Sequence, residues 1–170
     1  MQIQQDVRQT ILSWLDTQRL PYRAYEHAPA YTIDDCLAMP FINGHVTICK
    51  NVFLCNRQKT NFCLMLLRPI TPFRTAVVSK ALGLSRLSFA PQETLQGLLH
   101  LASGSVSPLA LYFDRTHEIT LCYEKDVRDT PEIAFHPCDN RSTLIFSQDV
   151  FWNRVLPALG VHPVAVEQVE

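Results

Sequence analysis

Two adjacent polar residues, Lys50 and Asn51, interrupt a long apolar stretch that otherwise is typical of a β-strand. If the lysine ammonium points into a cleft, it is a compact cation suited to a carbonyl oxygen or a phosphate. A lysine in an apolar strand is more commonly an edge residue whose charge lies in water. Both interpretations of Lys50 stay open from the residues alone.

A second candidate is the loop Gly104-Ser105-Val106-Ser107-Pro108. Glycine and serine next to a strand can present successive backbone N–H groups to an anion, as an oxyanion hole requires. The loop lacks the Gly-x-Ser-x-Gly pattern of a nucleophile elbow. A plain surface turn is the alternative.

A third candidate is His136, which precedes Pro137 and lies close to Asn140. A histidine at the end of a strand can position a water molecule or bind a phosphate. A histidine before proline is more often just a turn residue. Asp34 and Asp35 are better explained as charges at the start of a helix than as a catalytic pair.

The six cysteines, at positions 36, 49, 55, 63, 122 and 138, form no C-x-x-C pair, and no histidine is spaced with them as zinc requires. We therefore expect reduced thiols, no metal and no cofactor. Cys49 and Cys138 lie near the candidate segments, so a catalytic cysteine stays an alternative.

The net charge of −1 argues at first against a nucleic-acid partner. The charges are unevenly distributed, however, because residues 36–92 contain seven basic residues and no acidic one. This basic window is about +7 and the remainder about −8. The pattern favours either a solvated basic face or a local anion site that is too small for a long duplex.

The elements that must position these candidates form one α/β domain over residues 1–170, with strands in the middle and helices between them. Apolar spacing predicts an N-terminal helix over 4–18 that packs on the domain. The other predicted helices span 32–39, 73–82, 91–99 and 147–160, and the predicted strands span 22–26, 46–55, 62–67, 87–89, 109–113, 118–124, 133–135 and 143–146.

No apolar run is long enough to cross a bilayer, and residues 1–6 lack the basic flank and apolar core of a signal peptide. These features predict a cytoplasmic protein with no membrane partner.

Four motifs in order resemble the YbaK/ProX family of aminoacyl-tRNA editing domains, and the similarity runs from about Tyr22 to Pro163. The motifs are Lys50-Asn51-Val52-Phe53-Leu54, Leu87-Ser88-Phe89-Ala90, Gly104-Ser105-Val106-Ser107-Pro108-Leu109 and His136-Pro137-Cys138-Asp139-Asn140-Arg141-Ser142-Thr143. The nearest branch is similar to the free-standing ProX/PrdX type, whose members deacylate alanine mischarged on proline tRNA. The stretches 67–76, 100–103 and 138–141 depart from the pattern of relatives.

The resemblance implies a curved mixed β-sheet, a pseudo-barrel flanked by helices, with a pocket for the aminoacyl-adenosine end. It implies Lys50, Gly104 and His136 as catalytic residues. It also implies that substrate is bound by Asn51, Ser105, Val106, Ser107 and Asn140. An aminoacyl ester is already activated, so hydrolysis needs mainly a placed water and stabilisation of the oxyanion.

The function that we expect is trans-acting deacylation of mischarged tRNA, with Ala-tRNA(Pro) as the first candidate. The expected partners are the acceptor end of tRNA(Pro) and prolyl-tRNA synthetase. One alternative is a non-catalytic module of the same fold that binds a tRNA end or a nucleotide. Another is a regulator that binds an acidic protein through the basic window.

Overall fold

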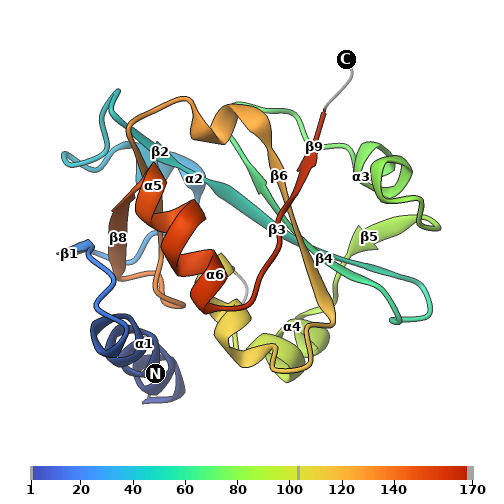
Figure 1. Ribbon diagram of the computed structural model, residues 1–170, viewed down its shortest axis with the longest axis horizontal. Helices are drawn as coiled ribbons and strands as arrows, with labels where there is room; N and C mark the ends of the chain where they lie inside the picture. Colours follow the sequence, from blue (N-terminus) through green and yellow to red (C-terminus); the bar gives the residue numbers. More distant parts are fainter. Residues whose placement is uncertain (1, 103, 168–170) are drawn as a thin grey trace.

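The computed structural model describes residues 2–102 and 104–167. The helices are α1 (Gln2–Thr17), α2 (Ile33–Leu37), α3 (Thr75–Leu82), α4 (Gln92–Leu99), η1 (Pro108–Phe113), η2 (Lys125–Arg128) and the C-terminal α5 (Gln148–Val150), η3 (Phe151–Val155) and α6 (Leu156–Ala158). The strands are β1 (Arg23–Glu26), β2 (Val46–Ile48), β3 (Lys50–Asn56), β4 (Phe62–Leu67), β5 (Leu87–Phe89), β6 (Ile119–Glu124), β7 (Glu132–Phe135), β8 (Ser142–Ser147) and β9 (Val164–Val166). The mixed α/β fold is thereby confirmed (Figure 1).

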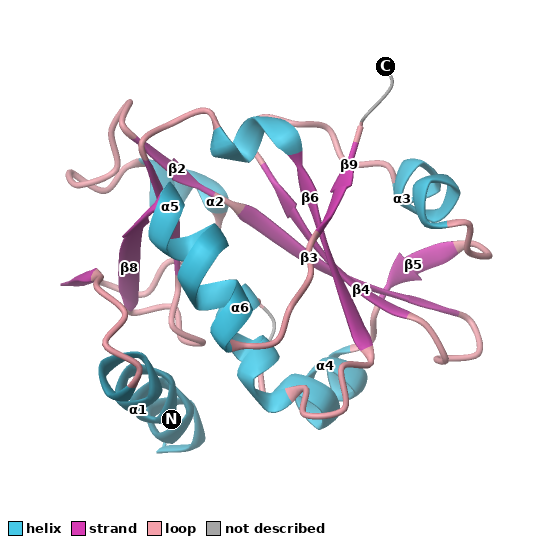
Figure 2. Cartoon of the chain, viewed as in Figure 1, coloured by secondary structure: helices cyan, strands magenta, loops and turns pink. Residues whose placement is uncertain are grey.

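The strands form two mixed sheets (Figure 2). The smaller sheet has the order β1-β8-β7-β2, and the larger has the order β5-β3-β4-β6-β9. Parallel pairing occurs between β2 and β7 in the smaller sheet, and between β4, β6 and β9 in the larger. Strand β9 was not predicted from the sequence.

The predicted strand over 46–55 is in fact two strands that belong to different sheets. Cys49 is the single residue between β2 and β3, so the chain passes there from one sheet to the other. Lys50 is therefore the first residue of β3 rather than a residue in the middle of a strand. Apolar residues lie on both sides of Lys50 and Asn51, and such a pattern does not show that the two halves belong to different sheets.

The predicted strand over 109–113 is wrong, because this segment forms the 3₁₀ helix η1. Pro108 occupies the first turn, where its fixed φ and missing N–H are favourable. The Ser107 hydroxyl caps this turn by accepting a hydrogen bond from the Leu109 amide at 3.2 Å. Local capping therefore outweighs the strand propensity of the apolar run.

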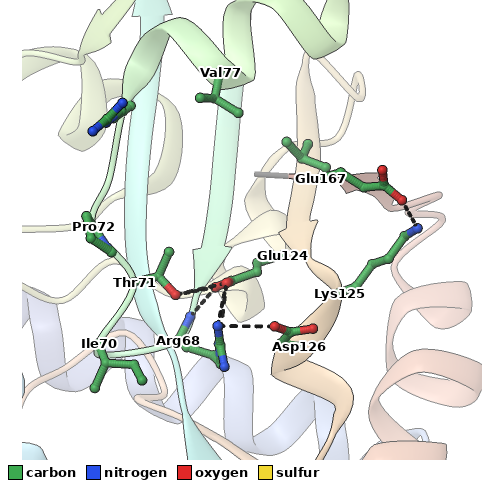
Figure 3. Close-up of a pocket in the computed structure, with 11 residues that line it drawn as sticks. Arg68, Ile70, Thr71, Pro72, Val77, Glu124, Lys125, Asp126 and Glu167 are labelled. Carbon is green, nitrogen blue, oxygen red and sulfur yellow. Dashed lines mark hydrogen bonds and ion pairs between the residues drawn. The ribbon is translucent and has the colours of Figure 1, made fainter. Parts of the chain in front are cut away.

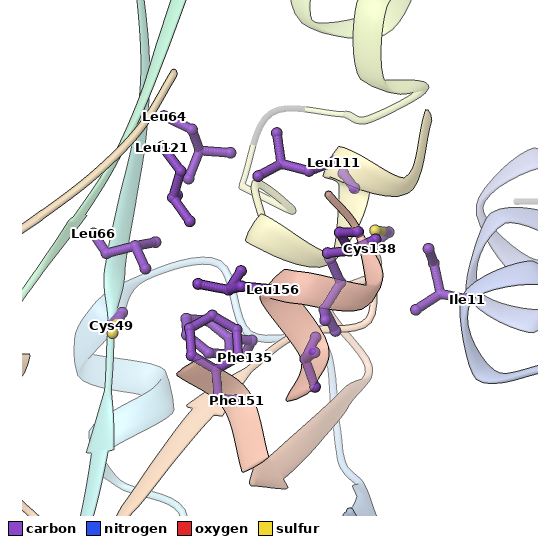
Figure 4. Close-up of a cluster of buried hydrophobic side chains, with 14 of the residues drawn as sticks. Ile11, Cys49, Leu64, Leu66, Leu111, Leu121, Phe135, Cys138, Phe151 and Leu156 are labelled. Carbon is purple, nitrogen blue, oxygen red and sulfur yellow. The ribbon is translucent and has the colours of Figure 1, made fainter. Parts of the chain in front are cut away.

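The main hydrophobic core lies where the C-terminal helix packs against both sheets (Figure 4). The Phe151 ring is 4.6 Å from that of Phe135 on β7 and 6.1 Å from that of Phe146 on β8. The next residue, Trp152, contacts Tyr123 on β6 with the ring centroids 4.5 Å apart. The helix therefore holds the two sheets in a fixed relative position.

The two ends of this helix are as predicted. The Ser147 hydroxyl accepts a hydrogen bond from the Val150 amide, and Gly160 follows the helix with a left-handed φ of 70°. In the middle, the Leu156 amide donates to the Phe151 carbonyl, which makes one wide π-helical turn. Pro157 comes directly after this turn and lacks the N–H that a regular helix would use.

Helix α1 confirms the predicted N-terminal helix, and its residues Val7, Ile11 and Leu15 are buried. Its Trp14 ring contacts Tyr112 of η1 at 5.7 Å. Among the described residues, no helix is both long enough and apolar enough to cross a bilayer.

Candidate active site

A cavity of about 180 Å³ lies at the junction of the two sheets. It brings together five residues that the sequence singled out, which are Lys50, Asn51, Gly104, Val106 and His136. The remaining lining residues are Ala30, Tyr31, Thr32, Ile33, Cys36 and Cys49. Segments that are more than a hundred residues apart in the sequence therefore meet in one small pocket.

The parallel pairing of β2 with β7 explains why Lys50 and His136 meet. Ile48 is in register with Ala134, and both strands run in the same direction. The residues that follow them, Cys49-Lys50 and Phe135-His136, therefore leave the same edge of the sheet. This arrangement follows from strand pairing, which neither segment specifies locally.

One wall of the pocket is the start of helix α2. The Thr32 hydroxyl accepts a hydrogen bond from the Asp35 amide, and the Asp35 carboxylate accepts from the amides of Tyr31 and Thr32. This capping box confirms the prediction that Asp35 is a charged residue at the start of a helix. The hydrogen bonds from the two backbone amides lower the pKa of the Asp35 carboxyl. The box fixes the backbone of the wall while the Tyr31 side chain stays 76% exposed.

Lys50 lines the pocket, and its ammonium donates a hydrogen bond to the Thr71 carbonyl at 3.0 Å. Within the described part of the chain, no carboxylate lies within ion-pair distance of this ammonium. One hydrogen bond to a neutral carbonyl leaves two N–H donors and an uncompensated positive charge. The ammonium is therefore suited to an anionic or polarised oxygen.

Asn51 connects β3 to the glycine-containing loop. Its Nδ2 donates to the Val106 carbonyl at 2.9 Å. Its Oδ1 is buried without a hydrogen-bond partner among the described residues. A buried acceptor that lacks a partner costs about 1–3 kcal/mol, so a ligand that supplied a donor there would recover stability.

The loop itself depends on Gly104, whose φ is +85°. A Cβ at this position would meet nothing within 4 Å, so the glycine is required by backbone conformation and not by space. The Ser105 amide donates to the Ala102 carbonyl at 3.2 Å. This turn uses the Ser105 N–H internally, so the Ser105 amide is not free to donate to a substrate oxygen.

His136 is held in one tautomer by its neighbours. Its Nδ1 lies 2.7 Å from the Ser142 carbonyl, so Nδ1 carries the proton and Nε2 is an acceptor. Nε2 lies 3.5 Å from the Cys36 Sγ. Burial lowers the pKa of His136 below its ordinary value, so the imidazole is neutral at neutral pH.

Behind His136, Thr143 and His27 extend the hydrogen-bonded chain. The Thr143 Oγ1 lies 3.3 Å from His136 Nδ1 and 2.8 Å from His27 Nε2. The His27 Nδ1 lies 2.7 Å from the Ala28 carbonyl and therefore carries the proton, so the Thr143 hydroxyl donates to His27 Nε2. The fourth motif contains Thr143 but assigns no role to its hydroxyl, and no sequence pattern marks His27 as a partner of this chain.

Three predicted binding residues do not line the pocket. Ser105 and Ser107 are buried at 2% and 0% exposure, and the Ser107 hydroxyl is the cap of η1. The Asn140 carbonyl accepts a hydrogen bond from the Ala30 amide at 2.9 Å, which ties its loop to the segment before α2. Contact of these three side chains with a substrate stays a prediction.

All six cysteines are buried free thiols. Burial raises the pKa of Cys49 far above its ordinary range, with a smaller contribution from the Glu124 charge. Burial also raises the pKa of Cys138 far above its ordinary range, and the Asp139 charge makes a smaller contribution. Neither thiol would ionise at neutral pH, which argues against a nucleophilic cysteine at these positions.

The described residues contain no cluster of three histidine, cysteine or acidic side chains placed to hold a metal ion.

The basic window of residues 36–92 is partly neutralised in the folded protein. Arg68 pairs with Glu124 and Asp126 at 3.2 and 3.1 Å, and Lys59 pairs with Glu93 at 3.7 Å. These acids lie outside the window, so tertiary contacts neutralise part of it.

The fold is that of editing domains and their structural relatives. A crystal structure described as a candidate trans-editing enzyme for prolyl tRNA synthetase aligns with a TM-score of 0.73 at 14% identity, covering 96% of this chain and 98% of that chain. A crystal structure of a hypothetical protein aligns with a TM-score of 0.71 at 15% identity, covering 92% and 97%. At these identities the likeness concerns the fold alone.

Residues 27–151 match the family model described as "Aminoacyl-tRNA editing domain", and the chain belongs to this family. The prolyl-tRNA editing protein ProX of Acetoanaerobium sticklandii is 29% identical over 144 residues, covering 85% of this chain and 87% of the relative. The prolyl-tRNA synthetase associated domain-containing protein 1 of Danio rerio is 26% identical over 142 residues, covering 82% and 76%. The resemblance that the four motifs indicated is thus confirmed.

Proposed function

We propose that this protein is a trans-acting aminoacyl-tRNA deacylase that hydrolyses the ester of mischarged tRNA, with Ala-tRNA(Pro) as its substrate. The observation that carries the proposal is the convergence of Lys50, Asn51, Gly104 and His136 on one cavity of about 180 Å³. Membership in the editing family and the similarity to a prolyl-tRNA editing protein support it.

In this proposal, Lys50 binds the carbonyl oxygen of the ester with its two remaining N–H donors. The charge that develops on this oxygen during water attack would be stabilised by an ammonium that no carboxylate neutralises. The Gly104 amide is the second donor to the same oxygen. The Ser105 amide is left out of this role because it donates to the Ala102 carbonyl.

His136 orients the attacking water or a ribose hydroxyl through Nε2, where this donor replaces the weak 3.5 Å contact with the Cys36 Sγ. The Nε2 atom is an acceptor because Nδ1 donates to the Ser142 carbonyl, and the low pKa of the ring keeps it neutral. A neutral acceptor can receive a proton from water or from a hydroxyl group, which a charged imidazolium cannot do. The buried Asn51 Oδ1, which lacks a partner, is the acceptor for an N–H or O–H of the bound substrate.

The size of the cavity supports a small aminoacyl group. A volume of about 180 Å³ is well below the roughly 300–1,000 Å³ of sites for drug-sized ligands. Steric rejection of a larger side chain is easier for a pocket than rejection of a smaller one, so alanine would be removed and a bulkier residue retained.

A hydrolysis assay on tRNA(Pro) charged with alanine, compared with cognate Pro-tRNA(Pro), tests the proposal. We expect the wild-type protein to release alanine and leave proline, and Lys50→Ala to lose at least about a hundredfold in rate, as for loss of one oxyanion donor. Lys80→Ala, an exposed lysine on α3, is the matched control. Full activity of Lys50→Ala would contradict the mechanism.

The same assay separates the proposal from a binding module of the same fold. Binding of aminoacyl-tRNA without turnover for any amino acid in a panel of mischarged tRNAs would favour the module.

We place the activity in the cytoplasm, and a partner such as prolyl-tRNA synthetase would supply contacts with the rest of the tRNA. Co-purification with the synthetase in the presence of tRNA tests this partner.

A further inference from the structure

The turn that follows β4 lines a second, larger cavity of about 650 Å³ (Figure 3). Thr71 belongs to this turn. The Thr71 carbonyl accepts a hydrogen bond from the Lys50 ammonium. Thr71 also lines the larger cavity, together with Arg68 and Glu124. The position of the lysine ammonium therefore depends on how this turn is held.

Glu124 holds the turn at several points. Its carboxylate accepts hydrogen bonds from the Thr71 hydroxyl at 2.8 and 2.9 Å and from the Arg68 amide at 3.0 Å. The Arg68 guanidinium adds contacts at 3.2 and 3.3 Å. The Glu124 residue is only 6% exposed, so these charge-assisted bonds lie in a region that solvent screens weakly.

The strand register places this anchor beside Lys50. Lys50 pairs with Leu67, the last residue of β4, and Arg68 begins the turn directly afterwards. Glu124 is the last residue of β6, the parallel neighbour of β4. Within the turn, the Thr71 amide donates to the Arg68 carbonyl at 3.2 Å, and Pro69 occupies the position that proline favours in such turns.

We propose that Glu124 is a positioning residue for Lys50 and acts through Thr71. The carboxylate binds the hydroxyl and the preceding turn, and the Thr71 carbonyl then binds the ammonium. Because Glu124 does not pair with Lys50 directly, the lysine is oriented without losing its positive charge. An acidic residue in direct contact would neutralise the cation that the oxyanion requires.

The decisive variant is Thr71→Val, which removes the hydroxyl and keeps the shape and the carbonyl. For deacylation, which rests on the proposed function, we expect kcat to fall about tenfold with KM changed less than about twofold, equivalent to the loss of one charge-assisted hydrogen bond. Thr71→Ser keeps the hydroxyl and should restore at least half of the wild-type kcat. Thr120→Val, an exposed threonine on β6, is the matched control.

A second measurement does not depend on the reaction. Mild acylation with an amine-specific reagent, followed by peptide mass spectrometry, gives the reactivity of Lys50 relative to exposed Lys80. We expect this ratio to change at least threefold in Thr71→Val and in Glu124→Gln, and to stay at the wild-type value in Thr71→Ser and Thr120→Val. Thermal unfolding establishes that each variant is folded at the assay temperature.

The outcomes separate the two proposals. If no mischarged tRNA is hydrolysed but the Lys50 reactivity changes as expected, the proposed function fails and the positioning role stands. If Thr71→Val is folded and leaves both kcat and the Lys50 reactivity unchanged, the positioning role is overturned. Equal loss of activity in Thr71→Val and Thr71→Ser would also overturn it, because the hydroxyl would then not be the group that matters.

Discussion

The Nε2 atom of His136 lies 3.5 Å from the Sγ atom of Cys36, which comes from a helix 100 positions earlier in the sequence. Burial, and then the Asp35 charge, raises the pKa of Cys36, so the sulfur keeps its proton. The thiol therefore donates a weak hydrogen bond to the ring nitrogen that faces the pocket. This contact joins α2 to the loop after β7 and favours the neutral imidazole.

Replacing Cys36 with alanine should raise the pKa of His136. The variant removes a donor that stabilises the neutral ring, and the smaller side chain also admits water and weakens the desolvation that lowers the pKa. NMR titration of the His136 Cε1 proton measures the effect. Cys55→Ala, a buried cysteine on β3, is the control, and an unchanged or lower pKa in Cys36→Ala would contradict the interpretation.

The stability of the protein should rise with pH between the lowered pKa of His136 and about 6.5, the ordinary value for histidine. In this interval the unfolded chain binds a proton that the folded chain excludes, so each increase in pH favours folding. The charged and titratable groups that act on the ring are His27, Asp139 and the Cys36 thiol.

Urea unfolding at a series of pH values from 5 to 7.5, roughly spanning this interval, measures the slope. In His136→Gln the part of the slope that comes from this group should disappear. His162→Gln, which changes an exposed histidine, should keep the wild-type slope. A steeper slope in His136→Gln than in the wild type would show that another group is responsible.

Removing the Thr143 hydroxyl should slow deacylation without abolishing it. Thr143→Val breaks the link from His27 to His136, and one such hydrogen bond contributes about 1 kcal/mol, or about fivefold in rate. The change should appear in kcat and in the pH profile. Thr47→Val is the control, because its buried hydroxyl bonds to Thr130 at 2.6 Å and does not touch the pocket. Equal deacylation rates for Thr143→Val and Thr47→Val would show that the hydrogen-bonded connection from His27 to His136 does not contribute to the reaction.

Substituting Gly104 should separate backbone strain from function. Gly104 and Gly83 have φ values of +85° and +65°, and a Cβ at either would meet nothing within 4 Å. Alanine at each position should therefore cost about 1–2 kcal/mol of stability from conformation alone. Only Gly104→Ala should also lose deacylase activity in the folded protein, because Gly83 caps α3. If Gly104→Ala and Gly83→Ala had comparable deacylase activity, the result would contradict a role of Gly104 in the active site.

Truncation of Phe151 should destabilise the whole domain. Its ring is fully buried between Phe135 and Phe146, so Phe151→Ala should lower the free energy of unfolding by about 3–5 kcal/mol. Phe89→Ala changes a phenylalanine that is 62% exposed and should cost less than about 1 kcal/mol. Chemical denaturation of the two variants tests the comparison, and similar losses would mean that the C-terminal helix does not hold the sheets together.

Local sequence signals predicted much of the fold. The predicted helices over 32–39, 73–82 and 147–160 begin or end close to where the pattern indicated, at the capping residues Thr32 and Ser147 and at the left-handed glycines 83 and 160. Each of these features is decided by a few neighbouring residues, since a hydroxyl cap or a positive φ acts within one turn of the chain. The apolar segment after Pro108 was misassigned because capping by Ser107 competes with strand propensity.

The sequence by itself determined which residues are candidates for the site: Lys50, Asn51, Gly104 and His136 are recognisable by type and by motif. Only the tertiary structure decided that they line one cavity and which groups surround them. Parallel pairing of β2 with β7 brings the lysine and the histidine together. Packing supplies Cys36, which no motif marks, as a partner of the histidine, and it gives Thr143 a contact with the ring that the motif alone does not specify. Burial sets the protonation state of His136, and the Glu124 carboxylate, distant in sequence, anchors the turn whose carbonyl holds Lys50. These properties depend on through-space contacts and on desolvation, which arise only when distant segments pack.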